Sequence, residues 1–455
     1  MTLFQKIMPT QQKTIFITSF YGFIGRNLLS SGMLDIFHQE PNLRIVIFLP
    51  AEKKELYKKL FPSDKIIVEG IGGMRGDSKL DRLFGTVFAF SSDVHCWRME
   101  LATFWRRGKY VHAALLWLLS KLGHLKAFRQ LVRWLDYTFE PKNLYKEYFE
   151  KYKPDLVFST DIFRDQDIYL MREARSRRVF VLGMVRSWDN VNSKGLNRII
   201  PDKTVVNSPV IKNEAIEYCD IKPDDIYVVG VPHYDRYVTE QRTSRAELFK
   251  KLNLDPNKKM VLISPPIRTY TYDPIAPAIV KALEPLNLQV VVRLHMMGKS
   301  NIGDLQSIPN KILIDAPDKV RDPVHADITV TDKDAYLADL LYHSDVVISH
   351  ISTLTIDAAV FNKPSIFIGF DVVSKPYYES LRRFHDMEYL KRVRETGGVR
   401  LAENLNQLVD YTRQYIANPK LDEEGRKNIV NNYCGKLDGK SSKRLVDAIL
   451  SCLNR

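Results

Sequence analysis

The sequence predicts an α/β protein with two parallel sheets, one in each half of the chain. Apolar runs of strand length alternate with segments whose apolar residues recur at helical spacing, from residue 13 to residue 371. With 455 residues the chain is too long for one ordinary core and suits two domains. Its 45% apolar and 11% aromatic content indicates a folded globular protein.

The first half opens with a strand, a turn that contains glycine and a helix. The strand covers residues 13–18, Gly22 and Gly25 lie in the turn, and the helix begins at Leu28. Further strands are expected at residues 44–49, 65–68, 154–161, 179–184, 203–207 and 226–230. This succession predicts a Rossmann-like N-terminal domain over residues 1–240.

Polar residues follow two of these strands directly. Asp161 ends the strand at 154–161, and Arg186, Trp188, Asp189 and Asn190 follow the strand at 179–184. Open α/β sheets bind their ligands at the carboxyl ends of strands. A carboxylate there is suited to deprotonate a hydroxyl group, so Asp161 and Asp189 are candidate general bases. The alternative is a set of helix caps and salt bridges.

Residues 97–135 form a basic stretch rich in tryptophan and predict a helical insertion. The stretch holds Trp97, Trp105, Trp117 and Trp134. Its basic residues are Arg98, Arg106, Arg107, Lys109, Lys121, Lys126, Arg129 and Arg133, against the single acid Glu100. The apolar run at 111–122 is too short to span a bilayer, but it suits the interface of an anionic membrane, with Trp105, Arg106, Arg107 and Trp117 as contacts. The alternative is a helix pair with a buried apolar face and a solvated basic face.

The charge and the cysteines narrow the class of protein. A net charge of +13 favours an anionic partner, and no nucleic-acid-binding signature is present. The four cysteines are far apart and form no C-x-x-C motif, which indicates reduced thiols rather than disulfides or a zinc site. Without a signal-peptide pattern or a spanning segment, we expect a cytoplasmic location.

The second half repeats the succession of strands and helices. Strands are expected at residues 259–264, 288–294 and 311–315, with helices at 275–283 and 334–343. Ser264 and Arg268 lie at the end of the first strand, and Arg293 and His295 at the end of the second. A second Rossmann-like domain is therefore predicted over 258–430, with the domain boundary within 236–257.

Residues 344–371 predict a strand, a polar turn, a helix and a further strand. Unpaired N–H groups and the helix dipole make such a turn favourable for an anion. The hydroxyls of Ser352, Thr353 and Thr355 add donors, and Asp357 lies one turn on, where it suits a ribose hydroxyl. The alternative is a capped helix in an ordinary α/β core.

These motifs resemble those of the GT-B glycosyltransferases, most closely the CDP-glycerol glycerophosphotransferases and related surface-polysaccharide transferases. The turn His350-Ile351-Ser352-Thr353 resembles their D-Y-S-S turn, with His350 in place of the acid. The segment 293–296 resembles K-x-H-P, with Arg and Met replacing Lys and Pro. Residues 438–444 resemble the D-G-K-x-x-x-R ending. The resemblance covers about residues 260–453.

The resemblance implies two Rossmann-like domains that face each other across a cleft, with residues 431–455 crossing back to the N-terminal domain. It implies that the donor is bound by Ser264, Arg268, Arg293, His350, Ser352, Thr353, Thr355, Asp357 and Asp371. It places the acceptor at Tyr21, Gly22, Gly25, Arg26, Arg186, Trp188 and Asn190. His295, Asp161 and Asp189 are the expected catalytic residues. Helix N-termini and basic side chains are expected to stabilise the leaving group, with no metal and no cofactor.

The first functional hypothesis is a glycosyltransferase that moves a sugar from a nucleotide-activated donor to a hydroxyl of a lipid-linked or surface-polysaccharide acceptor. The basic insertion would hold it at anionic lipid on the inner face of the cell membrane. Three alternatives stay open: a glycerophosphotransferase that uses CDP-glycerol, a UDP-sugar 2-epimerase, and a non-catalytic sugar- or lipid-binding protein.

Overall fold

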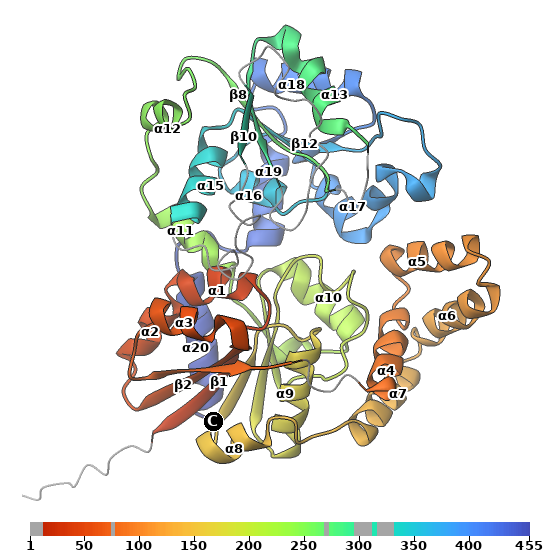
Figure 1. The fold of residues 1–455 in the computed structure, drawn as a ribbon, viewed down its shortest axis with the longest axis vertical. Helices are drawn as coiled ribbons and strands as arrows, with labels where there is room; N and C mark the ends of the chain where they lie inside the picture. Colours follow the sequence, from red (N-terminus) through yellow and green to blue (C-terminus); the bar gives the residue numbers. More distant parts are fainter. Residues whose placement is uncertain (1–11, 74–77, 268–272, 295–311, 316–331) are drawn as a thin grey trace, which may run out of the picture.

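Two parallel sheets, each covered by helices on both faces, make up the computed structural model (Figure 1). The structure describes residues 12–73, 78–267, 273–294, 312–315 and 332–455. Each sheet collects buried Val, Ile, Leu and Phe side chains on both faces, as continuous apolar strands require. The prediction of an α/β protein with two Rossmann-like domains is confirmed.

The N-terminal sheet has seven parallel strands in the order β3-β2-β1-β4-β5-β6-β7. The strands are β1 Lys13–Thr18, β2 Leu43–Pro50, β3 Ile66–Ile71, β4 Leu156–Ser159, β5 Phe180–Val185, β6 Lys203–Val206 and β7 Ile226–Val228. The chain starts in the middle of the sheet and changes direction between β1 and β4, which pair in register at Phe16 and Val157. A crevice for a ligand opens at such a switch point.

Helices cover both faces of this sheet. They are α1 Phe23–Asn27, α2 Met33–Gln39, α3 Lys54–Leu60, α8 Lys146–Tyr152, α9 Asp165–Ser176 and α10 Pro209–Cys219. The buried side chains of α1, α2 and α3 pack on one face, and those of α8, α9 and α10 pack on the other. The sheet is therefore the middle of three layers.

Four helices between β3 and β4 form a separate insertion, α4–α7, which projects to one side of the molecule (Figure 1). Its members are α4 Lys79–Phe90, α5 His95–Arg106, α6 Tyr110–Leu122 and α7 Lys126–Phe139. No helix within the described part of the chain is long and apolar enough to cross a membrane.

The C-terminal sheet has six parallel strands in the order β10-β9-β8-β11-β12-β13, which repeats the N-terminal pattern. The strands are β8 Met260–Ser264, β9 Gln289–Arg293, β10 Ile312–Asp315, β11 Val346–Ser349, β12 Ser365–Ile368 and β13 Val399–Ala402. The helices around it are α12 Arg245–Lys251, α13 Ile275–Leu283, α15 Asp332–His343, α16 Leu354–Val360, α17 Glu388–Glu395, α18 Leu405–Ala417 and α19 Glu423–Ile429. Its switch point lies between β8 and β11, which places the turn after β11 in the crevice.

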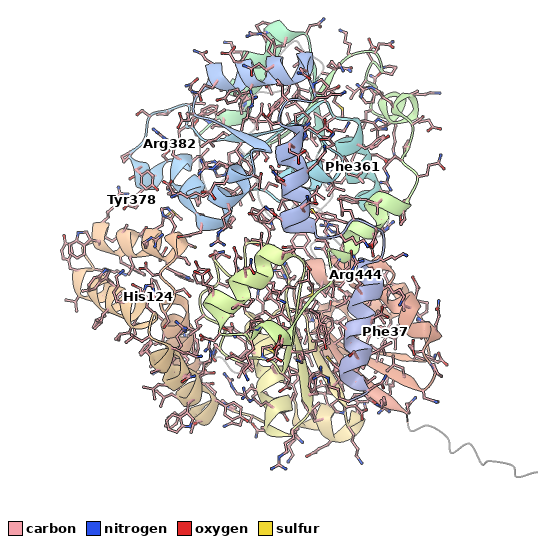
Figure 2. The ribbon with its side chains drawn as sticks, turned by 180° about the vertical axis from the view of Figure 1, so that it is seen from behind. Phe37, His124, Phe361, Tyr378, Arg382 and Arg444 are labelled. Carbon is pink, nitrogen blue, oxygen red and sulfur yellow. The ribbon has the colours of Figure 1, made fainter. Side chains whose placement is uncertain are left out.

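Two segments connect the domains. The first contains α11 (Asp235–Thr239), and the second leads from the C-terminal domain to α20 (Ser441–Leu453). The carboxylate of Asp235 accepts hydrogen bonds from the backbone N–H groups of Ser441 (2.9 Å) and Ser442 (2.7 Å) and so caps α20. Helix α20 then packs its buried face, including Leu445 and Ile449, into the N-terminal core beside α2, as Arg444 and Phe37 show (Figure 2).

Candidate functional site

A cavity of about 430 Å³ lies between the two domains, where the carboxyl ends of both sets of strands meet. Its N-terminal wall includes Tyr21, Phe23, Arg26, Asn27, Arg164, Arg186, Trp188, Asp189, Asn190, Lys194, Asn207 and His233. Its C-terminal wall includes Ser264, Arg293, Ser352, Thr353, Ile356, Asp357 and Tyr433. A concave site at two switch points is the expected place for a nucleotide-linked ligand.

The C-terminal wall brings three chain segments together. Ser264 ends β8 and Arg293 ends β9, and these strands are paired neighbours. Ser352 and Thr353 come from the turn between β11 and α16, and the Ser352 hydroxyl accepts a hydrogen bond from the N–H of Leu354 at 3.2 Å. One arginine and three hydroxyl groups thus line a common space, a set that suits phosphate oxygens.

Three predicted donor residues do not line the cavity. The hydroxyl of Thr355 is buried and hydrogen-bonds with Ser349 Oγ at 3.0 Å. His350 is buried against the rings of Phe384 and His385, and burial holds the pKa of its imidazole well below the ordinary value. The structure therefore assigns Thr355 and His350 to the packing behind the turn, because their side chains point into the core.

Asp371 is the third of these residues, and it holds a loop rather than facing the cavity. Its carboxylate accepts a hydrogen bond from the Ser380 hydroxyl and one from the Leu381 N–H (3.0 Å), and Lys375 lies 3.4 Å away. These contacts fix the start of the short helix η9 (Leu381–Asp386). The Asp371 carboxylate therefore stabilises the conformation of this loop.

Asp357 lines the cavity, and Tyr234, from the segment after β7, holds it in place. The Tyr234 hydroxyl donates to Asp357 Oδ1 at 2.5 Å, and both side chains are buried. Burial, followed by the charge of Asp357, raises the pKa of Tyr234 well above its ordinary value. The hydroxyl therefore stays protonated and orients the carboxylate.

On the N-terminal wall, two guanidinium groups lie close to the ring of Tyr21. Arg186 is 4.0 Å and Arg164 is 4.8 Å from the centre of its ring, within the range of cation–π attraction. Arg26 follows on α1 and also lines the cavity, whereas Gly22 and Gly25 do not. Gly25 lies inside α1, so the glycines of this turn contribute backbone only.

Asp161 is buried beneath these arginines. Its carboxylate is 3.2 Å from Arg186 Nε and 3.8 Å from Arg164 Nε, and it is absent from the cavity wall. The carboxylate is shielded from the cavity and paired with cations in this structure, which argues against the predicted role of Asp161 as general base. Its contacts orient Arg186 and Arg164 instead.

The loop after β5 carries a carboxylate that does reach the cavity. Asp189 lines it and accepts a hydrogen bond from the Ser187 hydroxyl at 2.5 Å. The neighbouring Trp188 donates from its indole Nε1 to Thr353 Oγ1 at 3.3 Å, across the cleft. Asn190 is 1% exposed, and its side-chain amide has no hydrogen-bond partner among the described residues. The loop therefore places Asp189 opposite the turn that follows β11.

Two predicted site residues, Arg268 and His295, lie outside the described residues. Sequence reasoning missed several residues that do line the cavity, among them Lys194, Asn207 and His233. Asn207 follows β6 directly and His233 follows β7 closely, so the rule on strand ends would have found both. Burial lowers the pKa of His233 to about 3, which keeps its imidazole neutral.

The charge of the cavity wall is positive. Arg26, Arg164, Arg186 and Lys194 line one side and Arg293 the other, against the carboxylates of Asp189 and Asp357. The residues that the structure describes contain no cluster of three or more His, Cys, Asp or Glu side chains placed to hold a metal ion. The arrangement suits a diphosphate ligand and a hydroxyl nucleophile.

These features define a GT-B fold, in which two Rossmann-like domains face each other across a cleft. The chain is similar to a UDP-GlcNAc 2-epimerase from Neisseria meningitidis bound to UDP-GlcNAc, at 14% identity and a TM-score of 0.54 over 96% of this chain and 100% of that one. It is also similar to the wall teichoic acid polymerase TagF with CDPG, at 13% identity and a TM-score of 0.51 over 97% and 89%. At these identities the likeness concerns the fold.

Residues 185–451 match the family model described as CDP-Glycerol:Poly(glycerophosphate) glycerophosphotransferase. This is more than half of the chain, so the protein belongs to that family. The match begins at residue 185, well before the resemblance at residues 260–453, and so includes the loop of Arg186 to Asn190. A teichoic acid glycerol-phosphate primase from Bacillus spizizenii is 29% identical over 176 residues, 38% of this chain and 41% of that protein's length.

Proposed function

We propose that the enzyme binds its donor on the C-terminal domain, residues 258–430, and its acceptor on the N-terminal domain, residues 1–240. The observation that carries this proposal is the contact of Trp188 with Thr353 inside the shared cavity. It brings the loop of Asp189 beside the turn between β11 and α16, which carries Ser352 and Thr353 and is called the donor turn. A transferase needs this juxtaposition, because the acceptor hydroxyl must meet the activated group without water between them.

We propose CDP-glycerol as the donor. Membership of the glycerophosphotransferase family favours CDP-glycerol over the nucleotide-activated sugar of the first hypothesis. The substitution of His350 for an acid is no obstacle, since that side chain is buried away from the cavity. The acceptor oxygen attacks the phosphorus that bears glycerol, a new P–O bond forms, and the bond from that phosphorus to the bridging oxygen breaks. CMP leaves with the bridging oxygen.

Each part of this step has a candidate residue. Asp189 accepts the proton of the acceptor hydroxyl. Arg293, with the hydroxyls of Ser352 and Thr353, stabilises the charge on the two phosphates. The carboxylate of Asp357, oriented by Tyr234, accepts a hydrogen bond from a hydroxyl group of the bound CDP-glycerol. Arg26, Arg186 and Lys194 hold an acceptor that carries negative charge.

A thermal-shift screen tests the donor. CDP-glycerol is compared with UDP-, GDP- and CMP-linked sugars, and the true donor should raise the melting temperature most, since a ligand of the native state stabilises it. A larger shift with a sugar nucleotide would restore the glycosyltransferase hypothesis. Conversion of a UDP-sugar without any acceptor would support the epimerase alternative, and binding without turnover the non-catalytic one.

We propose that the acceptor is lipid-linked or part of a surface polysaccharide, and that the insertion docks on anionic lipid at the inner face of the cell membrane. The insertion exposes large apolar side chains on α5, α6 and α7 and in the turn before α7, which together are called the apolar face. They are Trp105, Tyr110, Val111, Leu115, Trp117, Leu118, Leu125, Leu131, Trp134 and Phe139. An apolar surface with Trp and Tyr beside cations is typical of interfacial binding.

The cations of the insertion contribute less than their number suggests. Arg106 pairs with Glu379 at 2.7 Å, and Arg129 and Arg133 both pair with Asp220. Membrane attraction therefore depends on the apolar face together with exposed cations such as Arg107, which give the preference for anionic lipid. The double change of Trp105 and Trp117 to Ser should abolish sedimentation with phosphatidylglycerol vesicles, whereas Val238→Ser, an exposed apolar residue on α11, should not. Equal sedimentation of both variants would refute docking through this face.

A further inference from the structure

The insertion α4–α7 holds the cleft loop, residues 187–198, from behind. The N–H of Leu196 donates to the carbonyl of Phe88 at the end of α4 (2.9 Å). The Leu196 side chain is buried in a small core with Phe84, Phe88 and Val132, which belong to α4 and α7. Gly195 has φ +85°, and a Cβ there would lie 2.6 Å from the Cα of Ala89. The loop can approach α4 this closely only because glycine occupies this position.

Two buried arginines fix the far end of the same loop. Arg133 of α7 donates to the backbone carbonyl and to the side-chain oxygen of Asn197, both at 2.9 Å. Arg198 pairs with Asp81 of α4 at 2.7 Å and with Asp136 of α7. Charge-assisted hydrogen bonds of this kind define geometry strongly when they are buried. The arrangement of α4 and α7 therefore determines where the cleft loop lies. The residues that this loop places in the cleft are Trp188, Asp189, Asn190 and Lys194.

The insertion also reaches the C-terminal domain. The Glu388 carboxylate at the start of α17 accepts from the backbone N–H of His95 (2.9 Å) and pairs with Arg98 (2.6 Å). Further along α5, Arg106 pairs with Glu379 and lies 5.9 Å from the ring of Tyr378. Tyr378 marks this boundary in Figure 2. Helix α5 thus links the two walls of the cleft at one side.

One group of helices therefore joins three surfaces: the exposed apolar face, the cleft loop and the C-terminal domain. Helix α6 carries much of the apolar face, and its C-cap Gly123 packs so tightly that a Cβ would lie 1.9 Å from the carbonyl oxygen of Ser91, at the end of α4. A displacement of α6 therefore also displaces α4, because the two are in close contact at Gly123 and leave no space between them. From α4 the displacement reaches Leu196 and Gly195.

We propose that a lipid surface activates this enzyme by setting the cleft loop, so that the insertion is a regulatory element as well as an anchor. Docking of the apolar face stabilises the arrangement of α4 and α7 that places Asp189 opposite the donor turn. Turnover is then faster at a membrane than in solution. This inference rests on the proposed membrane docking. The turn that binds the donor contacts the cleft loop through Thr353 and Trp188. Coupling is reciprocal, so donor binding at that turn must strengthen vesicle binding by the factor by which vesicles strengthen donor binding.

Hydrogen exchange with phosphatidylglycerol vesicles, and with neutral phosphatidylcholine vesicles as the control, tests the proposal on the full chain. Anionic vesicles should slow exchange of the peptide that covers residues 187–198, and CDP-glycerol should tighten vesicle binding by at least about fivefold. Val111→Glu with Leu115→Glu should remove both effects. Leu196→Ala should keep vesicle binding but lose the change in loop exchange, since it removes the apolar contact between loop and insertion.

The outcomes separate the proposals. Wild-type protein that sediments with vesicles while its loop exchange and donor affinity stay unchanged would overturn the coupling and leave a plain anchor. A wild-type protein that does not sediment would overturn docking and coupling together. The transferase assignment is judged separately by the donor screen, which contains no lipid. If Leu196→Ala fails to fold, Arg98→Ala, on the surface, tests the link to the C-terminal domain by the same readouts.

Discussion

Replacing Trp188 with alanine should weaken the contact between the two walls of the cleft. The indole belongs to the N-terminal domain by sequence, yet it packs against the hydrophobic cores of both domains. It meets the rings of Tyr389 (4.9 Å) and Tyr433 (5.9 Å) edge to face and donates to Thr353 at 3.3 Å. Alanine removes all three contacts while it leaves the backbone of the loop in place.

The contacts give the size of the effect. Each aromatic pair contributes about 0.5–1.5 kcal/mol beyond its buried area. The hydrogen bond adds about 0.5–1.5 kcal/mol. The three contacts total about 1.5–4.5 kcal/mol, which corresponds to a loss of roughly 10- to 2,000-fold in kcat/KM when transfer needs all three. Trp188→Phe keeps an aromatic ring and loses the N–H donor, so its loss should be only about fivefold.

Initial rates of transfer with the donor found in the thermal-shift screen measure this effect. The melting temperature of each variant is recorded alongside, so that a loss of rate is not confused with unfolding. The reasoning would be refuted by a folded Trp188→Ala enzyme whose kcat/KM stays within about threefold of the wild type. An equal loss in the alanine and phenylalanine variants would show that the hydrogen bond to Thr353 carries the whole effect.

The remaining predictions concern chemistry and stability. Asp189→Asn should lower kcat by about 10²- to 10⁴-fold with donor affinity unchanged in calorimetry, and normal kcat would exclude it as the base. Arg293→Ala should weaken donor binding by roughly 10- to 150-fold, whereas the exposed Arg382→Ala should not. Burial raises the pKa of Asp167 and of Glu214 to about 7. Because these folded values lie above the unfolded ones, their stabilisation is complete at acidic pH and is lost as pH rises through about 7. The melting temperature should therefore fall as the pH rises from acidic values through about 7. Asp167→Asn should make the melting temperature depend less on pH over the same range.

The regular part of the fold was predictable because buried parallel strands are continuous apolar runs. The strand expected at 13–18 and the helix expected at 275–283 coincide with β1 and α13. Strand β13, Val399–Ala402, was missed. It has only four residues at a sheet edge, and Arg400 interrupts the apolar pattern because its guanidinium pairs with Asp422 at 2.6 Å. The ion pair that satisfies Arg400 is invisible in the sequence.

The candidate site was predictable to the level of the loop, and less so to the level of the side chain. Spacing identified the turn after β11, yet Ser352 faces the cavity and Thr355, three residues on, faces the core. Asp161 and Asp189 each follow a strand, but Asp161 lies under two arginines. Chain order gives the strand end, whereas the direction of a side chain is decided by partners far away in sequence.

The return of α20 to the N-terminal domain has a consequence for biosynthesis. The face of the first sheet that packs α1 and α2 also requires Leu445, Val446 and Ile449, which are made some 200 residues after β7, once the second domain has been translated. On the ribosome, the C-terminal domain can complete its core before the N-terminal one does. A fragment ending near residue 240 would leave an apolar groove open, so we expect it to aggregate unless residues 441–453 are supplied as a separate peptide.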